Sequence, residues 1–197
     1  MSKDLRTVIV VDYQNVHLTG HGLFASTRYL PKHETLVDPL LFARTLLRER
    51  NARQRPDQPA ATLRKVLVYR GQPSSEHDSD GYARSLAQQS QWERDDRVEV
   101  TLRPLKYEYQ RDATGRPATD YAGRRIVTGP PREKGVDVLC ALAAIREAQD
   151  DSTDLVILAS SDSDLAPVLD EVHRLGTAKI EMPACFETVG SVRTASQ

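Results

Sequence analysis

Four aspartates border or interrupt apolar segments, where carboxylates can do chemistry. Asp12 follows the apolar run at residues 7–11, and Asp162 and Asp164 follow another at residues 155–158. Asp137 lies inside a third apolar segment. Hard carboxylate oxygens select Mg²⁺ or Mn²⁺ over zinc, and such ions polarise phosphate esters and lower the pKa of bound water. If these side chains meet in the fold, the chain carries a divalent metal site.

The stretch at residues 155–167, LVILASSDSDLAP, predicts the element that organises the others. Its apolar start predicts a strand buried on both faces, and the spacing over residues 165–175 predicts a helix. Between the predicted strand and helix stand three serines, Ser160, Ser161 and Ser163, together with the two acids. This is the edge of the sheet at which open α/β folds bind ligands. Ser and Asp are also good helix N-caps, and the acidic pair alone does not separate capping from metal binding.

The β-branched run TVIVV at residues 7–11 predicts a first, central strand that ends at Asp12. Asn15 stands three positions on and could hold the oxygens of Asp12 by hydrogen bonding. The alternative is a turn in which both side chains serve only the backbone.

The segment at residues 133–149 predicts a helix in which Asp137 shares a face with Ala141, Ala144 and Ala148. An acid among small apolar residues on a buried helix is costly unless it is paired or bound to metal. We therefore expect Asp137 to be buried and to join the other acids.

Two charged residues open the same segment. Glu133 fits either a capping residue or an outer metal ligand, and Lys134 fits either a phosphate contact or a solvated lysine. The sequence leaves both alternatives open.

Residues 106–132 form an irregular basic insertion with several Gly and Pro turn signals. The insertion mixes rings with cations: Tyr107, Tyr109, Tyr121, Arg111, Arg116, Arg124, Arg125 and Arg132. Single-stranded nucleic acid binds to such mixtures, because cations contact phosphates and rings stack on bases. An exposed hairpin with solvated charges is the alternative, and the sequence favours neither.

The rest of the chain alternates between strand and helix patterns. We expect strands at residues 64–69, 98–105 and 178–182, the second at an edge, and helices at residues 38–52 and 80–94. This alternation predicts a three-layer α/β/α domain with a central, mostly parallel sheet. The strands at residues 7–11 and 155–158 should be neighbours at its centre.

Residues 16–37 predict a long loop with His17, His21 and His33. Their irregular spacing, with no cysteine nearby, favours solvated histidines over a metal site. Cys140 and Cys185 match no zinc or disulfide pattern and are expected to be buried free thiols.

The 197 residues suit one domain, which we place at residues 1–185, followed by a flexible tail at 186–197. The net charge of −1 excludes a global field that attracts nucleic acid. We find no run long enough to span a bilayer, no signal-peptide pattern and no internal repeat, so we expect a cytoplasmic protein with no membrane partner. Phosphate-loop and dinucleotide motifs are absent, which disfavours NTPases and dinucleotide enzymes.

Three motifs in this order, VDYQNV, KGVDV and LASSDSDLAPVL, resemble the NYN domain family of PIN-like ribonucleases. The resemblance covers residues 8 to about 182, and the ordered trio is more specific than any one motif. It implies a PIN-like fold and Mg²⁺- or Mn²⁺-dependent cleavage of RNA.

The resemblance assigns catalytic, metal-binding roles to Asp12, Asp137, Asp162 and Asp164. It makes Asn15 the site asparagine, and Ser160, Ser161 and Ser163 the small hydroxyl positions that orient the acids or a phosphate. Ser161 stands where glycine is common in the family, which affects how closely the backbone approaches the site.

The expected partner is RNA in single-stranded form, and the sequence leaves a homo-oligomer or a protein partner open. Two other functions compete with a ribonuclease. One is an RNA-binding or adaptor module with a vestigial metal site, which the presence of all four acids disfavours. The other is a phosphatase, which the lack of a second acid just after Asp12 disfavours.

Overall fold

The computed structural model describes residues 3–24, 30–55, 57–183 and 192–193. The strands are β1 (Leu5–Asp12), β2 (Ala61–Gln72), β3 (Val98–Pro104), β4 (Leu155–Ala159), β5 (Lys179–Pro183) and β6 (Val192–Arg193). The helices are α1 (Tyr13–Phe24), α2 (Pro39–Ala52), α3 (Ser79–Trp92), α4 (Val136–Ala148) and α5 (Ala166–Leu175), with short 3₁₀ turns η2 (Lys32–Glu34) and η3 (Ser163–Leu165).

The described strands form one sheet in the order β3-β2-β1-β4-β5-β6. Strands β1 to β5 run parallel, and β6 pairs antiparallel with β5. The predicted central pair of β1 and β4 and the predicted edge strand β3 are therefore confirmed. In the β1–β4 register Val11 pairs with Ala159, so Asp12 and Ser160 leave the sheet side by side.

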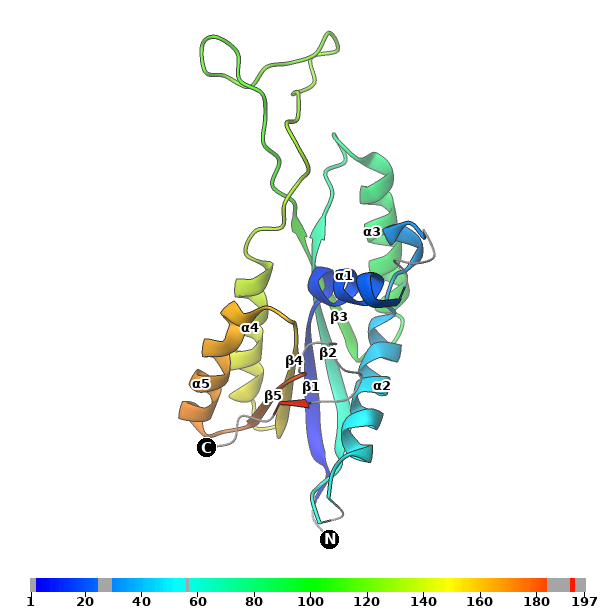
Figure 1. Ribbon diagram of the computed structural model, residues 1–197, viewed down its shortest axis with the longest axis vertical. Helices are drawn as coiled ribbons and strands as arrows, with labels where there is room; N and C mark the ends of the chain where they lie inside the picture. Colours follow the sequence, from blue (N-terminus) through cyan, green and yellow to red (C-terminus); the bar gives the residue numbers. More distant parts are fainter. Residues whose placement is uncertain (1–2, 25–29, 56, 184–191, 194–197) are drawn as a thin grey trace.

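Alternating residues of the central strands feed two cores, one on each face of the sheet. Val8 and Val10 pack toward α4 and α5, whereas Ile9 and Val11 pack with residues of α1, α2 and α3. Figure 1 shows the helices on both sides of the sheet. The predicted three-layer α/β/α architecture is confirmed.

The prediction of a loop at residues 16–37 is wrong for residues 16–24, because these belong to helix α1. Tyr13, Val16 and His17 are buried at helical spacing against the core, and this tertiary packing overcomes a weak helical pattern interrupted by glycines. The prediction of solvated histidines is wrong for His17, whose Nε2 lies 2.9 Å from the Lys32 carbonyl oxygen.

The other two histidines of this segment, His21 and His33, differ in their surroundings. The Nδ1 of His21 lies 2.8 Å from the Thr35 hydroxyl. His33 is exposed on η2, as expected of a solvated histidine.

Most other predicted elements agree with the structure within a few residues. Asp38 caps α2 by accepting from the Leu41 N–H at 2.8 Å. α4 begins at Val136 rather than at Glu133. No helix in the described ranges is long and apolar enough to cross a membrane.

Two predictions concern the end of the chain and the thiols. Cys140 is a buried free thiol as expected, whereas Cys185 lies outside the described residues. Within the segment predicted as a flexible tail, Val192 and Arg193 instead form β6.

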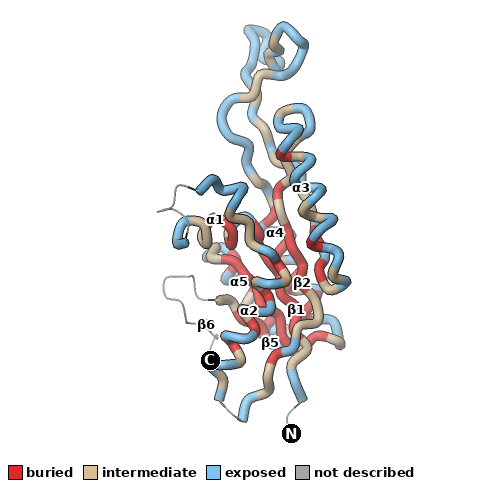
Figure 2. The backbone as a smooth tube through the Cα atoms, turned by 90° about the vertical axis from the view of Figure 1, so that its right-hand side faces the viewer, coloured by how far each residue is buried: buried red, intermediate tan, exposed pale blue. Residues whose placement is uncertain are grey.

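Residues 105–132, here called the arm, leave the end of β3 and return just before α4. The arm projects beyond the layered body (Figure 1) and is mostly exposed (Figure 2). Bridges from Lys106 to Arg132 and from Tyr109 to Val127 hold its two sides together.

A buried ion pair ties α2 to the sheet. The Arg50 guanidinium donates two hydrogen bonds, of 2.7 and 2.6 Å, to the carboxylate of Glu181 on β5. Both side chains are only 7 % exposed. Two charges this deep in the protein depend on each other, because water cannot replace either partner.

We expect Glu181→Ala to lower the free energy of unfolding by about 3–5 kcal/mol, because it leaves the Arg50 charge buried and unpaired. Urea denaturation at neutral pH measures the change. The control is Glu171→Ala, which removes the partner of the largely exposed Arg174 and should cost at most about 1 kcal/mol. Equal losses in the two variants would contradict this account of the buried pair.

Candidate functional site

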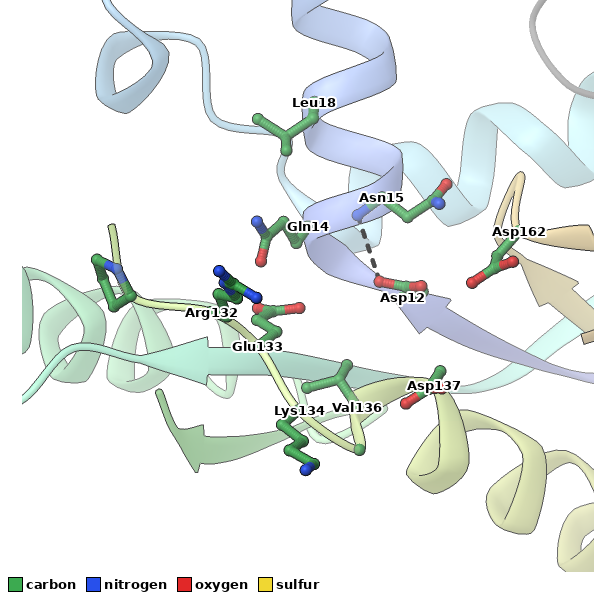
Figure 3. Close-up of a pocket in the computed structure, with 12 residues that line it drawn as sticks. Asp12, Gln14, Asn15, Leu18, Arg132, Glu133, Lys134, Val136, Asp137 and Asp162 are labelled. Carbon is green, nitrogen blue, oxygen red and sulfur yellow. Dashed lines mark hydrogen bonds between the residues drawn. The ribbon is translucent and has the colours of Figure 1, made fainter. Parts of the chain in front are cut away.

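A pocket of about 580 Å³ opens at the carboxyl edge of the sheet. It is formed by the end of β1, the start of α1, the return of the arm and the start of α4 (Figure 3). Its lining residues are Asp12, Gln14, Asn15, Leu18, Pro131, Arg132, Glu133, Lys134, Gly135, Val136, Asp137 and Asp162. Three of the four predicted acids therefore share one pocket.

Asp12 is the most deeply placed of these acids and is 7 % exposed. Its Oδ1 accepts from the Asn15 backbone N–H at 3.3 Å, and its Oδ2 accepts from the Ser160 hydroxyl at 3.2 Å. Burial raises the pKa of Asp12, and the charges of Asp162 and Asp137 raise it further, although both hydrogen bonds oppose the shift. A carboxylate in this position gains stability from a nearby cation.

Hydrogen bonds join the end of β1 to the end of β4. The Ser160 hydroxyl that donates to Asp12 also accepts from the Asp162 N–H at 3.1 Å. The side-chain Oδ1 of Asn15 accepts from the N–H and the hydroxyl of Ser161 at 2.8 and 2.6 Å. The Asn15 backbone, rather than its side chain, thus holds Asp12, while its side chain orders the β4 turn.

Asp137 occupies the first turn of α4 and faces the pocket with Asp12 and Asp162 (Figure 3). The expectation of a buried acid is wrong, because Asp137 is exposed. Val136 and Cys140 point into the core in its place, since the start of α4 lies at the sheet edge. Asp137 therefore combines access to solvent with a place in the acidic cluster.

The structure does not bring Asp164 and Ser163 into the pocket. Both are exposed on η3, and the Asp164 N–H donates to Asp162 Oδ1 at 2.9 Å. Asp162 thus caps η3, the simpler of its two predicted roles, and also lines the pocket.

Glu133 is a fourth carboxylate of the pocket, for which the sequence left the role open. It accepts a short hydrogen bond from the Gly71 N–H at the end of β2. With the Gln14 side-chain amide oriented to satisfy both its ends, the Gln14 nitrogen lies 2.9 Å from both Glu133 oxygens. Burial, with a smaller contribution from Asp12, raises the pKa of Glu133 to about 6. In the sequence, the feature that points to this role for Glu133 is its position four residues before Asp137.

Two cationic residues lie on the pocket wall that the arm provides. Arg132 and Lys134 both line the pocket and are exposed. The Lys134 carbonyl accepts from Arg103 Nε at 2.6 Å, which ties this wall to β3.

Three residues predicted to bind RNA contact the body at the base of the arm. The Tyr107 hydroxyl accepts from the Ser74 N–H at 2.9 Å, and the His77 ring contacts the rings of Tyr107 and Tyr109. Arg125 lies 4.5 Å from the Tyr109 ring centre and pairs with Glu76 at 2.7 Å. These contacts are structural ones.

Two more of the predicted RNA-binding residues lie near the tip of the arm. Arg111 donates to the Gly115 carbonyl at 2.6 Å. Arg124 forms an exposed ion pair with Asp120 at 3.3 Å.

The donors of the pocket are of the type that Mg²⁺ or Mn²⁺ prefers. Among the described residues, no three acidic, histidine or cysteine side chains form a group that could hold one ion between them. Mg²⁺ in proteins is commonly held by one or two carboxylates and keeps several water ligands. One or two of the pocket carboxylates Asp12, Asp137 and Asp162, with water as the other ligands, match the needs of such a partly hydrated ion.

The fold of this chain is similar to that of a solved structure, whereas searches by sequence give no match. No family model and no curated protein matches this chain. A crystal structure of a protein of unknown function from Vibrio parahaemolyticus is similar over 92 % of this chain and 82 % of that chain, with a TM-score of 0.48 and 20 % identity.

We expect Glu133→Gln to stabilise the metal-free protein at pH 7–8 but not near pH 4. Folding raises the pKa of Glu133 from 4.5 to about 6, so the native protein loses stability as the pH rises through that window. Glutamine does not titrate, and the expected gain is on the order of 1 kcal/mol after allowance for solvent screening.

Urea denaturation at several pH values measures this difference. Glu108→Gln, at an exposed position on the arm, is the matched control and should follow the wild type at every pH. A Glu133→Gln variant whose stability parallels the wild type from pH 4 to pH 8 would show that the carboxylate is not perturbed.

Proposed function

We propose that this chain is a metal-dependent ribonuclease that hydrolyses phosphodiester bonds. The observation that supports it most strongly is that Asp12, Asp137 and Asp162, from distant parts of the chain, line one pocket. Helix capping alone gives no reason for three like charges to share a space, because they repel each other unless a cation or protons neutralise them. The resemblance to NYN domains supports the same proposal.

In this proposal one or two of Asp12, Asp137 and Asp162 would bind Mg²⁺ or Mn²⁺ directly, and the remaining acid would bind water ligands of the ion. A bound ion supplies Lewis-acid polarisation of the phosphate and lowers the pKa of a bound water. The hydrogen bonds from Asn15 and Ser160 fix the Asp12 carboxylate, so its oxygens need no reorganisation when the substrate arrives.

The cations and the fourth acid of the pocket take the remaining roles. Arg132 and Lys134 contact the phosphate groups from the arm side of the pocket. With a pKa of about 6, Glu133 is largely ionised at neutral pH and can accept a proton from the attacking water.

We expect Asp12→Asn to lower the rate of RNA cleavage by at least about 100-fold, because it removes a carboxylate charge that binds the metal ion in this proposal. Asparagine can still cap α1, so the fold should persist. The measurement is cleavage of a labelled single-stranded RNA with Mn²⁺ or Mg²⁺, which chelator should abolish. Asp137→Asn should behave in the same way.

Asp164→Asn is the matched control, because it makes the same chemical change outside the pocket and should retain most activity. Equal activity of all variants would point to a contaminating nuclease and contradict the proposal. RNA binding without cleavage under any divalent ion would instead favour a binding module with a vestigial site. Hydrolysis of a small phosphate monoester but not of RNA would favour a phosphatase.

A further inference from the structure

The tip of the arm is built from two copies of one turn, a repeat that the sequence analysis missed. Residues 112–116 read DATGR and residues 120–124 read DYAGR. In each turn the first residue is an Asp, and its Oδ1 accepts hydrogen bonds from the N–H groups of the third and fifth residues at 2.8–3.0 Å. Gly115 and Gly123 both have positive φ, of 81° and 77°, which a side chain would strain.

A ring of backbone hydrogen bonds joins the two turns to the rest of the arm. Gln110, Ala118 and Ile126, each eight residues apart, donate in a cycle: Gln110 to Ile126, Ile126 to Ala118 and Ala118 to Gln110, at 2.7–2.9 Å. The arm therefore has a defined shape at its tip without a core of its own.

Basic residues outnumber acidic residues on the arm. The arm carries six basic and three acidic residues. Two of those acids, Asp112 and Asp120, accept hydrogen bonds inside their own turns, which lowers the pKa of each. The guanidinium of Arg116 is exposed, and no described residue pairs with it.

Tyr121 is the aromatic residue that the arm presents to solvent, and its side chain is fully exposed. The other two tyrosines of the arm pack at its base. No other large apolar side chain of the arm is exposed within the described chain, so the tip lacks the apolar patch typical of a protein interface. A lone exposed ring among cations suits stacking on an unpaired base.

The arm also leads directly to the acidic pocket. Its return strand ends in Arg132, and Arg132, Glu133 and Lys134 line the pocket. The arm thus connects its tip, along the chain, to the pocket that Asp12 lines.

We propose that the tip of the arm binds single-stranded RNA, with Tyr121 stacked on a base and Arg116 and Arg124 on phosphates. This inference rests on the proposed ribonuclease function and specifies its substrate as an unpaired strand long enough to reach from the pocket to the tip.

The test measures binding apart from cleavage. Full-length protein carrying Asp12→Asn is titrated, in chelator, into a fluorescently labelled single-stranded RNA over a range of salt concentrations. Replacing both Arg116 and Arg124 by Ala should weaken binding and make the plot of log K against log salt shallower by about 1.4, since each phosphate contact on a single strand contributes about 0.7. Tyr121→Ala should weaken binding at least about 5-fold with the same slope.

The matched control replaces Arg48 and Arg174 by Ala, because both are exposed arginines on helices outside the arm and the pocket. It should leave the salt slope unchanged. Equal effects of the two double variants, or no binding of single-stranded RNA at all, would overturn the proposal. Duplex RNA bound as tightly as the single strand would overturn the stacking role of Tyr121.

Cleavage by protein with Asp12 intact separates this inference from the function on which it rests. With Mn²⁺, the arm variants should cut a trinucleotide at the wild-type rate and a long RNA more slowly. Wild-type rates on the long RNA would overturn the arm proposal while the ribonuclease stands. If the wild type cuts neither RNA, the ribonuclease fails, and the binding titrations still decide the role of the arm.

Discussion

The adjacency of β1 and β4 at the centre of a parallel sheet is the constraint on which the rest of this structure depends. Parallel strands end at the same edge, so residues that follow them in sequence meet in space. Asp12 and Ser160 meet in this way, and the Ser160 hydroxyl connects Asp12 to the backbone of Asp162. Without that pairing, the two acidic motifs would be separate helix caps about 150 residues apart in the chain.

The acidic charges at this edge of the sheet destabilise the folded state, and they favour the binding of a cation. Burial and the charges of its neighbours disfavour the ionised form of Asp12, and Glu133 is shifted in the same direction. Carboxylates with perturbed pKa values are common at functional sites. There, binding a ligand requires several like charges close together, and their repulsion lowers the stability of the fold. The buried Arg50–Glu181 pair, in contrast, satisfies both its charges within the fold.

The arm solves a different physical problem, which is to hold a shape without a hydrophobic core. Paired turns, each closed by its own Asp and Gly, and a ring of backbone hydrogen bonds define its tip. The rings of Tyr107 and Tyr109 against His77 fix its base to the body. The division explains why aromatic residues of one segment take opposite roles: those near the body are packed, and Tyr121 at the tip is exposed.

The order of residues along the chain was enough to predict the layered architecture, the central pair of strands and three acids of the pocket. Those features depend on local apolar periodicity and on the rule that parallel strands share an edge. The three-dimensional packing was needed to establish that residues 13–24 are helical, that Asp137 is exposed, that Glu133 lines the pocket and that Asp164 does not. It also decided that Tyr107 and Tyr109 pack against His77. The physical reason is that these outcomes depend on where a side chain points relative to elements distant in sequence, which local spacing does not specify.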